Sequence, residues 1–344
     1  MMTASETPAP ETAPPAAVVI LNWNQPDLTR RCLTHVHAQD YPNQRVVVVD
    51  NGSRPAGRVV LEPDSPAELV QLPANLGFAG GMNAGIRHAL AAGAEYVWLL
   101  NNDAFPGPDC LTRLVAAVAE AGDIAAATPA LFSEDGGEQH CGSTVDWRTL
   151  EMVPFLSAAP APDGFGKWLV GTAPLFRAAA LRAAGGFDAR YFAYMEEVDL
   201  FLRCQRLGYR SAVVPAARCL HLGSASTGGD HSPTSVYLIT RNAWLLWARH
   251  PHRRGGAARA LALVTGGLAD VYADLTRGWT ARARARLLGL TAGLRREIGP
   301  PRLLHSRSPL QALAAAALRR CPYRILAAGR AGGLYALARS GARA

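Results

Sequence analysis

Short apolar segments recur through the first third of the chain, three of them followed directly by Asn or Asp, and this feature constrains the fold most. The four segments are residues 17–21, 45–49, 69–72 and 96–100. Runs of this length and composition are typical of strands buried in a parallel sheet. The stretches 26–36 and 81–92 between them place apolar residues at helical spacing. Strands that alternate with helices predict an α/β fold with a doubly wound sheet.

Polar residues follow three of the predicted strands directly. They are Asn22-Trp23-Asn24, Asp50-Asn51-Gly52 and Asn101-Asn102-Asp103. Sheets of this kind bind ligands beyond the carboxyl ends of their strands. We therefore predict a binding site at this edge of the sheet.

Charge divides the chain into two unequal regions. Residues 1–232 hold 16 Lys/Arg and 24 Asp/Glu, whereas residues 233–344 hold 19 Arg and three acids. We predict a disordered leader (1–16), a catalytic domain (17–232) and a basic helical extension (233–344), with helices over 236–250, 257–295 and 308–340.

The leader lacks the basic and apolar regions of a signal peptide, and the chain has no apolar run of 18 residues. The six cysteines form neither a C-x-x-C pair nor a zinc pattern, which fits a reducing cytoplasm.

Seven motifs in a fixed order carry a resemblance to family 2 glycosyltransferases of the GT-A fold, in particular the rhamnosyltransferase-like branch. They begin at Val19, Val49, Asn75, Leu99, Gly186, Met195 and His221 and read VILNWN, VDNGS, NLGFAGGMN, LLNND, GFD, MEEVDL and HLGS. The resemblance covers roughly residues 17–225. It implies a mixed GT-A sheet and inverting, metal-dependent sugar transfer from a nucleotide-diphospho-sugar to an acceptor hydroxyl.

The donor site is expected at the strand ends and in the glycine-rich stretch after them. The resemblance implies that Asp50 reads a uracil or thymine ring, whereas the residues alone equally suit an Asp that caps a turn. The donor-binding residues expected in all are Asn22, Asn24, Asp50, Asn51, Asn75, Gly80, Gly81, Asn83, Asn101 and Asn102. Glycines 77, 80, 81 and 85 favour a loop before a helix that approaches an anion, or a purely structural loop. Their spacing does not match the dinucleotide-binding pattern.

Asn101-x-Asp103 occupies the position of the family's Asp-x-Asp motif. A carboxylate together with diphosphate oxygens suits Mg²⁺ or Mn²⁺, and the cation would offset the charge on the departing nucleoside diphosphate. His221 is expected either as a further metal ligand, as the resemblance implies, or as a structural histidine.

Three carboxylates, Glu196, Glu197 and Asp199, lie within four residues. One of them could accept the acceptor's hydroxyl proton, and the resemblance points to Glu197, with Glu196 as the alternative. Without the resemblance, the cluster could be a solvated helix N-terminus. Asp199 could face the acceptor or pair with Arg203. Trp168, Gly171 and Thr172 correspond to the acceptor-side loop, although Trp168 also suits the core.

The Arg-rich extension carries Trp244 and Trp247 beside basic residues and a second cluster at Arg282, Arg284, Arg286, Arg295 and Arg296. It could lie on an anionic membrane, form a homodimer interface or be a solvated face. Nucleic-acid binding is disfavoured because no such module is present.

The donor is expected to be a UDP- or dTDP-sugar, with rhamnose or another deoxysugar transferred to an acceptor that could be lipid-linked. The enzyme would then assemble cell-surface glycans in the cytoplasm or at the inner face of the plasma membrane. Two alternatives remain open: a glycosyltransferase of secondary metabolism and a non-catalytic module that binds sugar nucleotides.

Overall fold

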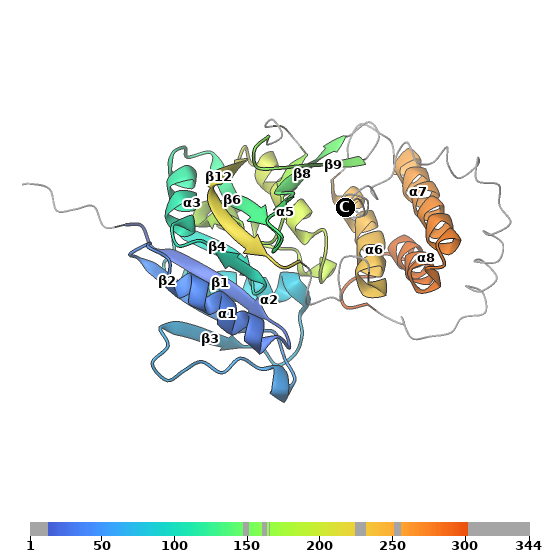
Figure 1. Cartoon of the computed structure of the whole chain (residues 1–344). Coiled ribbons are helices and arrows are strands. Elements are labelled where there is room, and N and C mark those ends of the chain that lie inside the picture. Colours follow the sequence, from blue (N-terminus) through green and yellow to red (C-terminus); the bar gives the residue numbers. More distant parts are fainter. Residues whose placement is uncertain are drawn as a thin grey trace, which may run out of the picture.

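A mixed sheet of nine strands organises the protein. The computed structural model describes residues 13–146, 151–159, 164, 166–223, 232–250 and 256–301, and helices cover both faces of the sheet (Figure 1). In spatial order the strands are β3 (Ala67–Gln71), β2 (Gln44–Asp50), β1 (Ala16–Asn22), β4 (Tyr96–Asn101), β11 (Leu175–Arg177), β6 (Ile124–Phe132), β12 (Arg210–His221) and β5 (Ala104–Pro106), and β7 (Glu138–Gln139) pairs with β6.

The first four strands run parallel, as the alternation of strands and helices predicts, and the other half of the sheet makes it mixed. β11 is antiparallel to both β4 and β6, and β5 is antiparallel to β12. In the parallel half, Asn22 pairs with Asp50, and Leu21 pairs with Asn101. This register brings the three polar strand ends to one edge of the sheet.

Successive side chains of the central strands point to opposite faces of the sheet and belong to two separate cores. On β1, Val18 and Ile20 pack toward α1 (Pro26–His37) and α3 (Cys110–Ala119). Ala17 and Val19 pack on the other face. The helices that cover this face are α2 (Gly77–Ala91), α4 (Ala178–Ala184) and α5 (Glu196–Arg206). A strand buried on both faces needs apolar residues at every position, which is why these segments read as continuous apolar runs.

A small antiparallel sheet lies beside the main one. Its strands are β10 (Lys167–Leu169), β8 (Gly142–Asp146) and β9 (Glu151–Phe155). Trp168 on β10 is 3% exposed and belongs to the core that includes α5. The alternative in which Trp168 is a core residue therefore describes its position.

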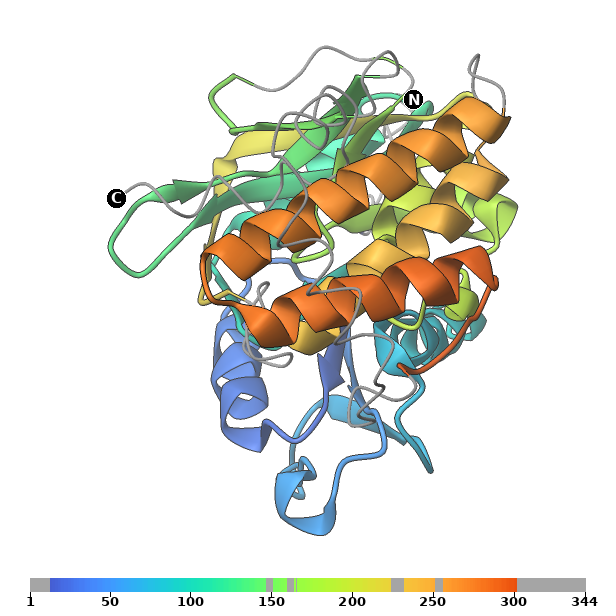
Figure 2. The same ribbon diagram turned by 90° about the vertical axis from the view of Figure 1, so that its right-hand side faces the viewer.

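Three helices follow the sheet: α6 (Pro233–Arg249), α7 (Gly256–Thr276) and α8 (Thr280–Leu294). Figure 2 shows α7 and α8 as the outer layer of this region. Leu246 and Trp247 of α6 join the same core as the sheet, so the proposed division of the chain at residue 232 does not separate two cores. Among the described residues, no helix combines the length and the apolar character that a membrane span needs.

The expectation of one helical stretch over 257–295 is wrong in one respect. Gly278, at φ +77°, breaks it between α7 and α8, because glycine adopts this left-handed conformation without steric cost. The helix expected over 308–340 and nearly all of the leader expected over 1–16 lie outside the described residues.

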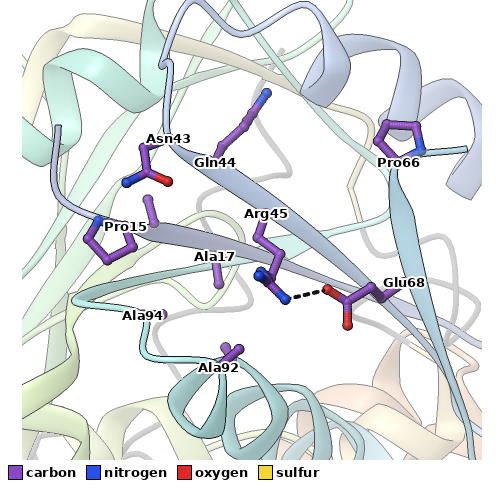
Figure 3. A pocket seen from close by; sticks show the side chains of 11 residues that line it. Pro15, Ala17, Asn43, Gln44, Arg45, Pro66, Glu68, Ala92 and Ala94 are labelled. Carbon is purple, nitrogen blue, oxygen red and sulfur yellow. Dashed lines mark hydrogen bonds and ion pairs between the residues drawn. The ribbon is translucent and has the colours of Figure 1, made fainter. Parts of the chain in front are cut away.

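A surface pocket lies at the opposite edge of the sheet from the polar strand ends. Figure 3 shows Asn43 and Arg45 of the β2 region beside Glu68 of β3 and Ala94 before β4. These residues precede or begin their strands, so the pocket is remote from the predicted site. Arg45 Nη1 lies 3.0 Å from Glu68 Oε1, so this ion pair joins the neighbouring parallel strands β2 and β3.

Candidate functional site

Asn22, at the end of β1, ties together the turns at the edge of the sheet. Its Nδ2 donates to Asp50 Oδ2 at 2.9 Å and to Ser53 Oγ at 3.1 Å. Its Oδ1 accepts a hydrogen bond from Thr29 Oγ1 at 2.9 Å. Asn24 adopts φ +57° and accepts from the backbone N–H of Arg54 at 2.9 Å. The two asparagines therefore link the turns that follow β1 and β2 through hydrogen bonds.

Asp50 is fully buried between these two turns. Its Oδ1 accepts from the backbone N–H of Ser53 at 2.9 Å, and its Oδ2 accepts from Asn22 and from the backbone N–H of Val59. These contacts match the interpretation of Asp50 as a residue that caps a turn. Contact with a nucleobase stays a prediction.

Asn51 fastens the end of β2 to the start of α2. Its Nδ2 donates to Asn75 Oδ1 and to the carbonyl oxygen of Gly77, both at 3.0 Å, and its Oδ1 accepts from the backbone N–H of Leu76. The helix begins at Gly77, so the expectation of a glycine loop that leads to a helix at Gly81 is wrong. In the first turn, the backbone N–H groups of Gly77 and Ala79 already donate to Asn75 Oδ1 and to the carbonyl oxygen of Phe192, at 2.8 and 3.1 Å.

Two other glycines of this stretch lie in close contacts. A Cβ atom on Gly81 would lie 2.6 Å from Leu21 Cδ1 of β1, so this glycine allows α2 to lie close to the sheet. A Cβ atom on Gly80 would lie 2.7 Å from Leu76 Cβ, at the start of the same helix. Asn83 exchanges two hydrogen bonds with the backbone of Phe187, at 2.8 and 2.9 Å. Packing accounts for all three residues, and their contact with a donor stays a prediction.

The end of β4 presents three polar residues with different surroundings. Asn101 is partly exposed, and its backbone N–H donates to the carbonyl oxygen of Thr172 at 2.9 Å. Asn102 is buried and donates to Thr29 Oγ1 at 3.1 Å. Asp103 is only 4% exposed. Thr172 is thus brought to the same edge as Asn101, as the acceptor-side prediction requires.

Asp103 and His221 face each other across the edge of the sheet. His221 Nε2 lies 3.6 Å from Asp103 Oδ1, and the backbone N–H of Leu222 donates to the carbonyl oxygen of Asp103. His221 Nδ1 lies 2.8 Å from Gln139 Oε1. Sequence reasoning missed Gln139, because a glutamine on the two-residue strand β7 belongs to no motif.

These two side chains have the chemistry of a partial metal site. Within the described ranges, no group of three or more His, Cys, Asp or Glu side chains could hold a metal ion. A cation between Asp103 and His221 would therefore need ligands from a bound molecule, and diphosphate oxygens are suitable. Two ligands of one cation can lie 3.6 Å apart, because each Mg²⁺–ligand bond is about 2.1 Å long.

The carboxylates of α5 follow a stretch of unusual backbone. Phe192, Tyr194 and Met195 have φ values of +67°, +69° and +74°. Residues other than glycine rarely adopt such positive backbone angles. Glu196 is 4% exposed, and among the described residues its Oε2 has no hydrogen-bond partner. Burial raises the pKa of Glu196 well above its usual value, and the adjacent Glu197 raises it further.

Glu197 is partly exposed and lies beside the predicted acceptor-side loop. A Cβ atom on Gly171 would lie 3.8 Å from Glu197 Cβ and 3.8 Å from Phe78 Cζ. A side chain at Gly171 would thus be in van der Waals contact with Glu197, which places Gly171 directly beside it. The interpretation of the cluster as a fully solvated helix N-terminus is wrong, because Glu196 and Asp199 are buried.

Asp199 is the centre of a buried ion cluster. Arg203 Nε lies 2.8 Å from Asp199 Oδ2, which confirms the predicted pair, and His250 Nε2 lies 2.7 Å from Oδ1. Arg249 adds a third contact at 3.2 Å. Burial would raise the pKa of Asp199, but the hydrogen bond with His250 and the two arginines outweigh burial and lower it. Both oxygens are engaged, so a role facing the acceptor stays a prediction.

Several arginines of the extension make internal ion pairs. Arg286 is 5% exposed and lies 2.6 Å from Asp274, and Arg282 lies 3.3 Å from the same residue. Within the predicted basic cluster, Arg286 is therefore buried and does not lie at the surface. Arg295 and Arg296 at the end of α8 are exposed.

The chain is similar to known glycosyltransferases. The model of the family described as Glycosyl transferase family 2 matches residues 17–183. The N-acetylglucosaminyl-diphospho-decaprenol L-rhamnosyltransferase of Mycobacterium tuberculosis is 30% identical over 289 residues, which cover 72% of this chain and 88% of the relative. Galactofuranosyltransferase GlfT1 of Mycolicibacterium smegmatis is 28% identical over 212 residues, covering 59% and 69%.

A solved structure supports the fold over nearly the whole chain. The mannosyltransferase PcManGT from Pyrobaculum calidifontis, in complex with GDP-Man and Mn²⁺, has a TM-score of 0.51 and 19% identity and covers 94% of this chain and 87% of its own. The predicted GT-A fold with C-terminal helices is thus confirmed.

Proposed function

The chain belongs to glycosyltransferase family 2, and from that premise we propose that it is an inverting, metal-dependent enzyme. In this proposal it transfers a sugar from a nucleotide-diphospho-sugar to an acceptor hydroxyl. The observation that carries the proposal is the position of Asp103 and His221 at the edge of the sheet where the strand ends meet. Family membership argues against the alternative of a non-catalytic module.

Asp103 and His221 would hold Mg²⁺ or Mn²⁺ together with the donor diphosphate. The imidazole ligand favours Mn²⁺, because Mg²⁺ prefers oxygen ligands. When bound, the cation would stabilise the negative charge that develops on the leaving nucleoside diphosphate. The nearby asparagines and Asp50 would orient the nucleoside.

Glu197 would accept the proton of the acceptor hydroxyl as that oxygen attacks the anomeric carbon. Glu197 is partly exposed, with its Oε2 buried, whereas Glu196 is buried as a whole residue. A single displacement inverts the configuration, and the proposal requires no second, nucleophilic carboxylate. Glu196 remains the alternative base because its raised pKa suits proton transfer near neutral pH.

We propose a deoxysugar such as rhamnose on a dTDP or UDP carrier, and a lipid-linked acceptor for cell-surface glycan assembly. The support is the similarity to the mycobacterial relative whose name specifies rhamnose transfer to a decaprenol-linked sugar. A secondary-metabolite acceptor is the alternative, and incubation with a panel of nucleotide sugars and both acceptor types distinguishes the two.

We further propose that the extension contacts the cytoplasmic face of the membrane without crossing it. Trp279, 43% exposed at the turn between α7 and α8, has the guanidinium groups of Arg277 and Arg282 within 5.2 and 4.3 Å of its ring centre. An aromatic ring beside cations is typical of an interfacial contact. Trp279→Ser should weaken sedimentation with vesicles that contain anionic lipid. If the extension is a dimer interface instead, Trp279→Ser should shift the protein from dimer to monomer in size-exclusion chromatography.

Two substitutions test the catalytic proposal. Asp103→Asn should abolish both transfer and Mn²⁺-dependent nucleotide binding, whereas Glu197→Gln should lower the rate of transfer by about 10²–10⁴-fold and leave nucleotide binding intact. Full transfer activity in EDTA would rule out the metal. If Glu196→Gln proved more damaging than Glu197→Gln, the base would be Glu196.

A further inference from the structure

The backbone immediately before the α5 carboxylates is held by two side chains from outside the region that the family model matches. Residues 191–195 lead from the end of a short 3-10 helix (Ala189–Tyr191) to the start of α5, and three of them have positive φ. Such conformations persist only where the surroundings enforce them. Side chains of α6 supply contacts of this kind.

Asn242 contacts three carbonyl oxygens of this segment. Its Nδ2 lies 3.0 Å from the oxygen of Tyr191, 2.8 Å from that of Ala193 and 2.7 Å from that of Tyr194. Asn242 is 1% exposed, so these carbonyl groups would have little access to water if the amide were removed. An unsatisfied buried carbonyl is costly, and the segment would move to find other donors.

Arg241 fixes which way the Asn242 amide faces. Its Nε and Nη2 donate to Asn242 Oδ1 at 2.9 and 2.8 Å, and Nη2 also donates to the carbonyl oxygen of Tyr191. Since a guanidinium only donates, it selects the oxygen of the amide and directs the NH₂ group to the segment. The two side chains thus act as one unit.

The held segment connects both halves of the proposed site. The carbonyl oxygen of Phe192 accepts a hydrogen bond from the backbone N–H of Ala79, in the first turn of α2. A Cβ atom on Gly77 would lie 2.2 Å from that same oxygen, so the contact requires glycine there. At its other end, the segment leads directly into Glu196 and Glu197.

We propose that Arg241 and Asn242 are positioning residues, which set the place of the Glu196–Glu197 pair relative to the donor side of the site through residues 191–195. This inference rests on the proposed role of the two glutamates. It gives α6 a part in the reaction, apart from any contact that the extension makes with a membrane.

Asn242→Asp tests the proposal with little change in volume. The carboxylate keeps the contact with Arg241 but places an oxygen against three carbonyl oxygens. Thr240→Val is the matched control, because Thr240 is equally buried on α6 and its hydroxyl donates only to its own helix, at Val236. We expect faster hydrogen–deuterium exchange over residues 191–197 in Asn242→Asp, but not in Thr240→Val.

In the same variant, kcat for transfer should fall about 10- to 100-fold, because small displacements of catalytic groups have effects of this size. Binding of the nucleoside diphosphate with Mn²⁺ should stay close to that of the unaltered protein. Unchanged exchange and kcat in Asn242→Asp would overturn the proposal, and so would equal losses of kcat in Thr240→Val. If the unaltered protein transferred no sugar from any donor, the proposed function would fail, while the exchange measurement would still test the contact.

Discussion

Gln139 Oε1 lies 2.8 Å from His221 Nδ1, while the Gln139 amide nitrogen donates to the carbonyl oxygen of His221 at 3.0 Å. The backbone acceptor fixes the orientation of the amide, so the ring nitrogen that faces Oε1 must carry the proton. In the neutral ring, Nε2 then carries the lone pair, on the side where Asp103 lies. A hydrogen bond of this kind is what prepares a histidine to bind a metal ion.

Gln139→Leu should therefore weaken Mn²⁺ binding in the presence of nucleoside diphosphate by about 10- to 100-fold, because the ring loses the group that fixes its tautomer and orientation. Isothermal titration with Mn²⁺ measures the change. Glu138→Gln is the control, since Glu138 accepts hydrogen bonds from Ser157 instead. Equal affinity in Gln139→Leu and the unaltered protein would count against His221 as a ligand.

The sequence was sufficient to predict the strand ends but not their partners. Local patterns define a buried strand and the polar residue after it, so Asn22, Asp50 and Asp103 could be placed at one edge. Gln139 is separated from His221 by 82 residues, and no periodic pattern marks such a contact. The left-handed backbone before α5 was equally hidden, because Phe192 and Tyr194 are not residue types that predict it.

The start of α2 shows how a local preference can mislead. Four glycines in nine residues predict a loop, since glycine disfavours helices. Close packing against β1 outweighs that preference, because any side chain at Gly85 would clash with Val19.

Gly85→Ala should therefore destabilise the fold by about 1–3 kcal/mol, as added volume in a packed core does. The new Cβ would lie 2.2 Å from Val19 Cγ1 and 3.0 Å from Val49 Cγ2, so α2 must move away from the sheet. Urea unfolding measures the effect. Gly122→Ala is the control, because no atom lies within 4 Å of a Cβ there. Equal stability of the two variants would show that α2 adjusts freely.

Asp199→Asn should destabilise the protein by about 1–3 kcal/mol, because it takes the buried carboxylate away from His250 and from the partly buried Arg203 and Arg249. The pKa of Asp199 is lowered in the folded protein, so the stability that it adds is present above the unfolded pKa and is lost as the pH falls through the folded pKa. The difference between variant and unaltered protein should therefore shrink in acid, as measured by urea unfolding across pH.

The exposed pair of Asp123 and Arg210 provides the comparison. Asp123→Asn should have a much smaller effect, because solvent screens a pair whose side chains are 49% and 47% exposed. If Asp199→Asn were as mild as Asp123→Asn, the buried cluster would not hold α5 to the end of α6.

Glu196→Gln should make the protein more stable at alkaline pH and change little in acid. The raised pKa of Glu196 means that the unfolded chain releases its proton before the folded protein does. The stability linked to this group is thus fully present below the unfolded pKa and is lost as the pH rises through the folded pKa, by up to about 1.4 kcal/mol per pH unit. Glutamine carries no proton to release, so the variant should escape this loss.

Urea unfolding at about pH 5 and about pH 8 measures the difference, with the exposed Glu120→Gln as control. Between these two pH values, the difference in free energy of unfolding between variant and unaltered protein should grow in favour of Glu196→Gln and stay constant for Glu120→Gln. A constant difference for both variants would mean that Glu196 ionises as freely when folded as when unfolded. That result would count against Glu196 as the alternative base near neutral pH.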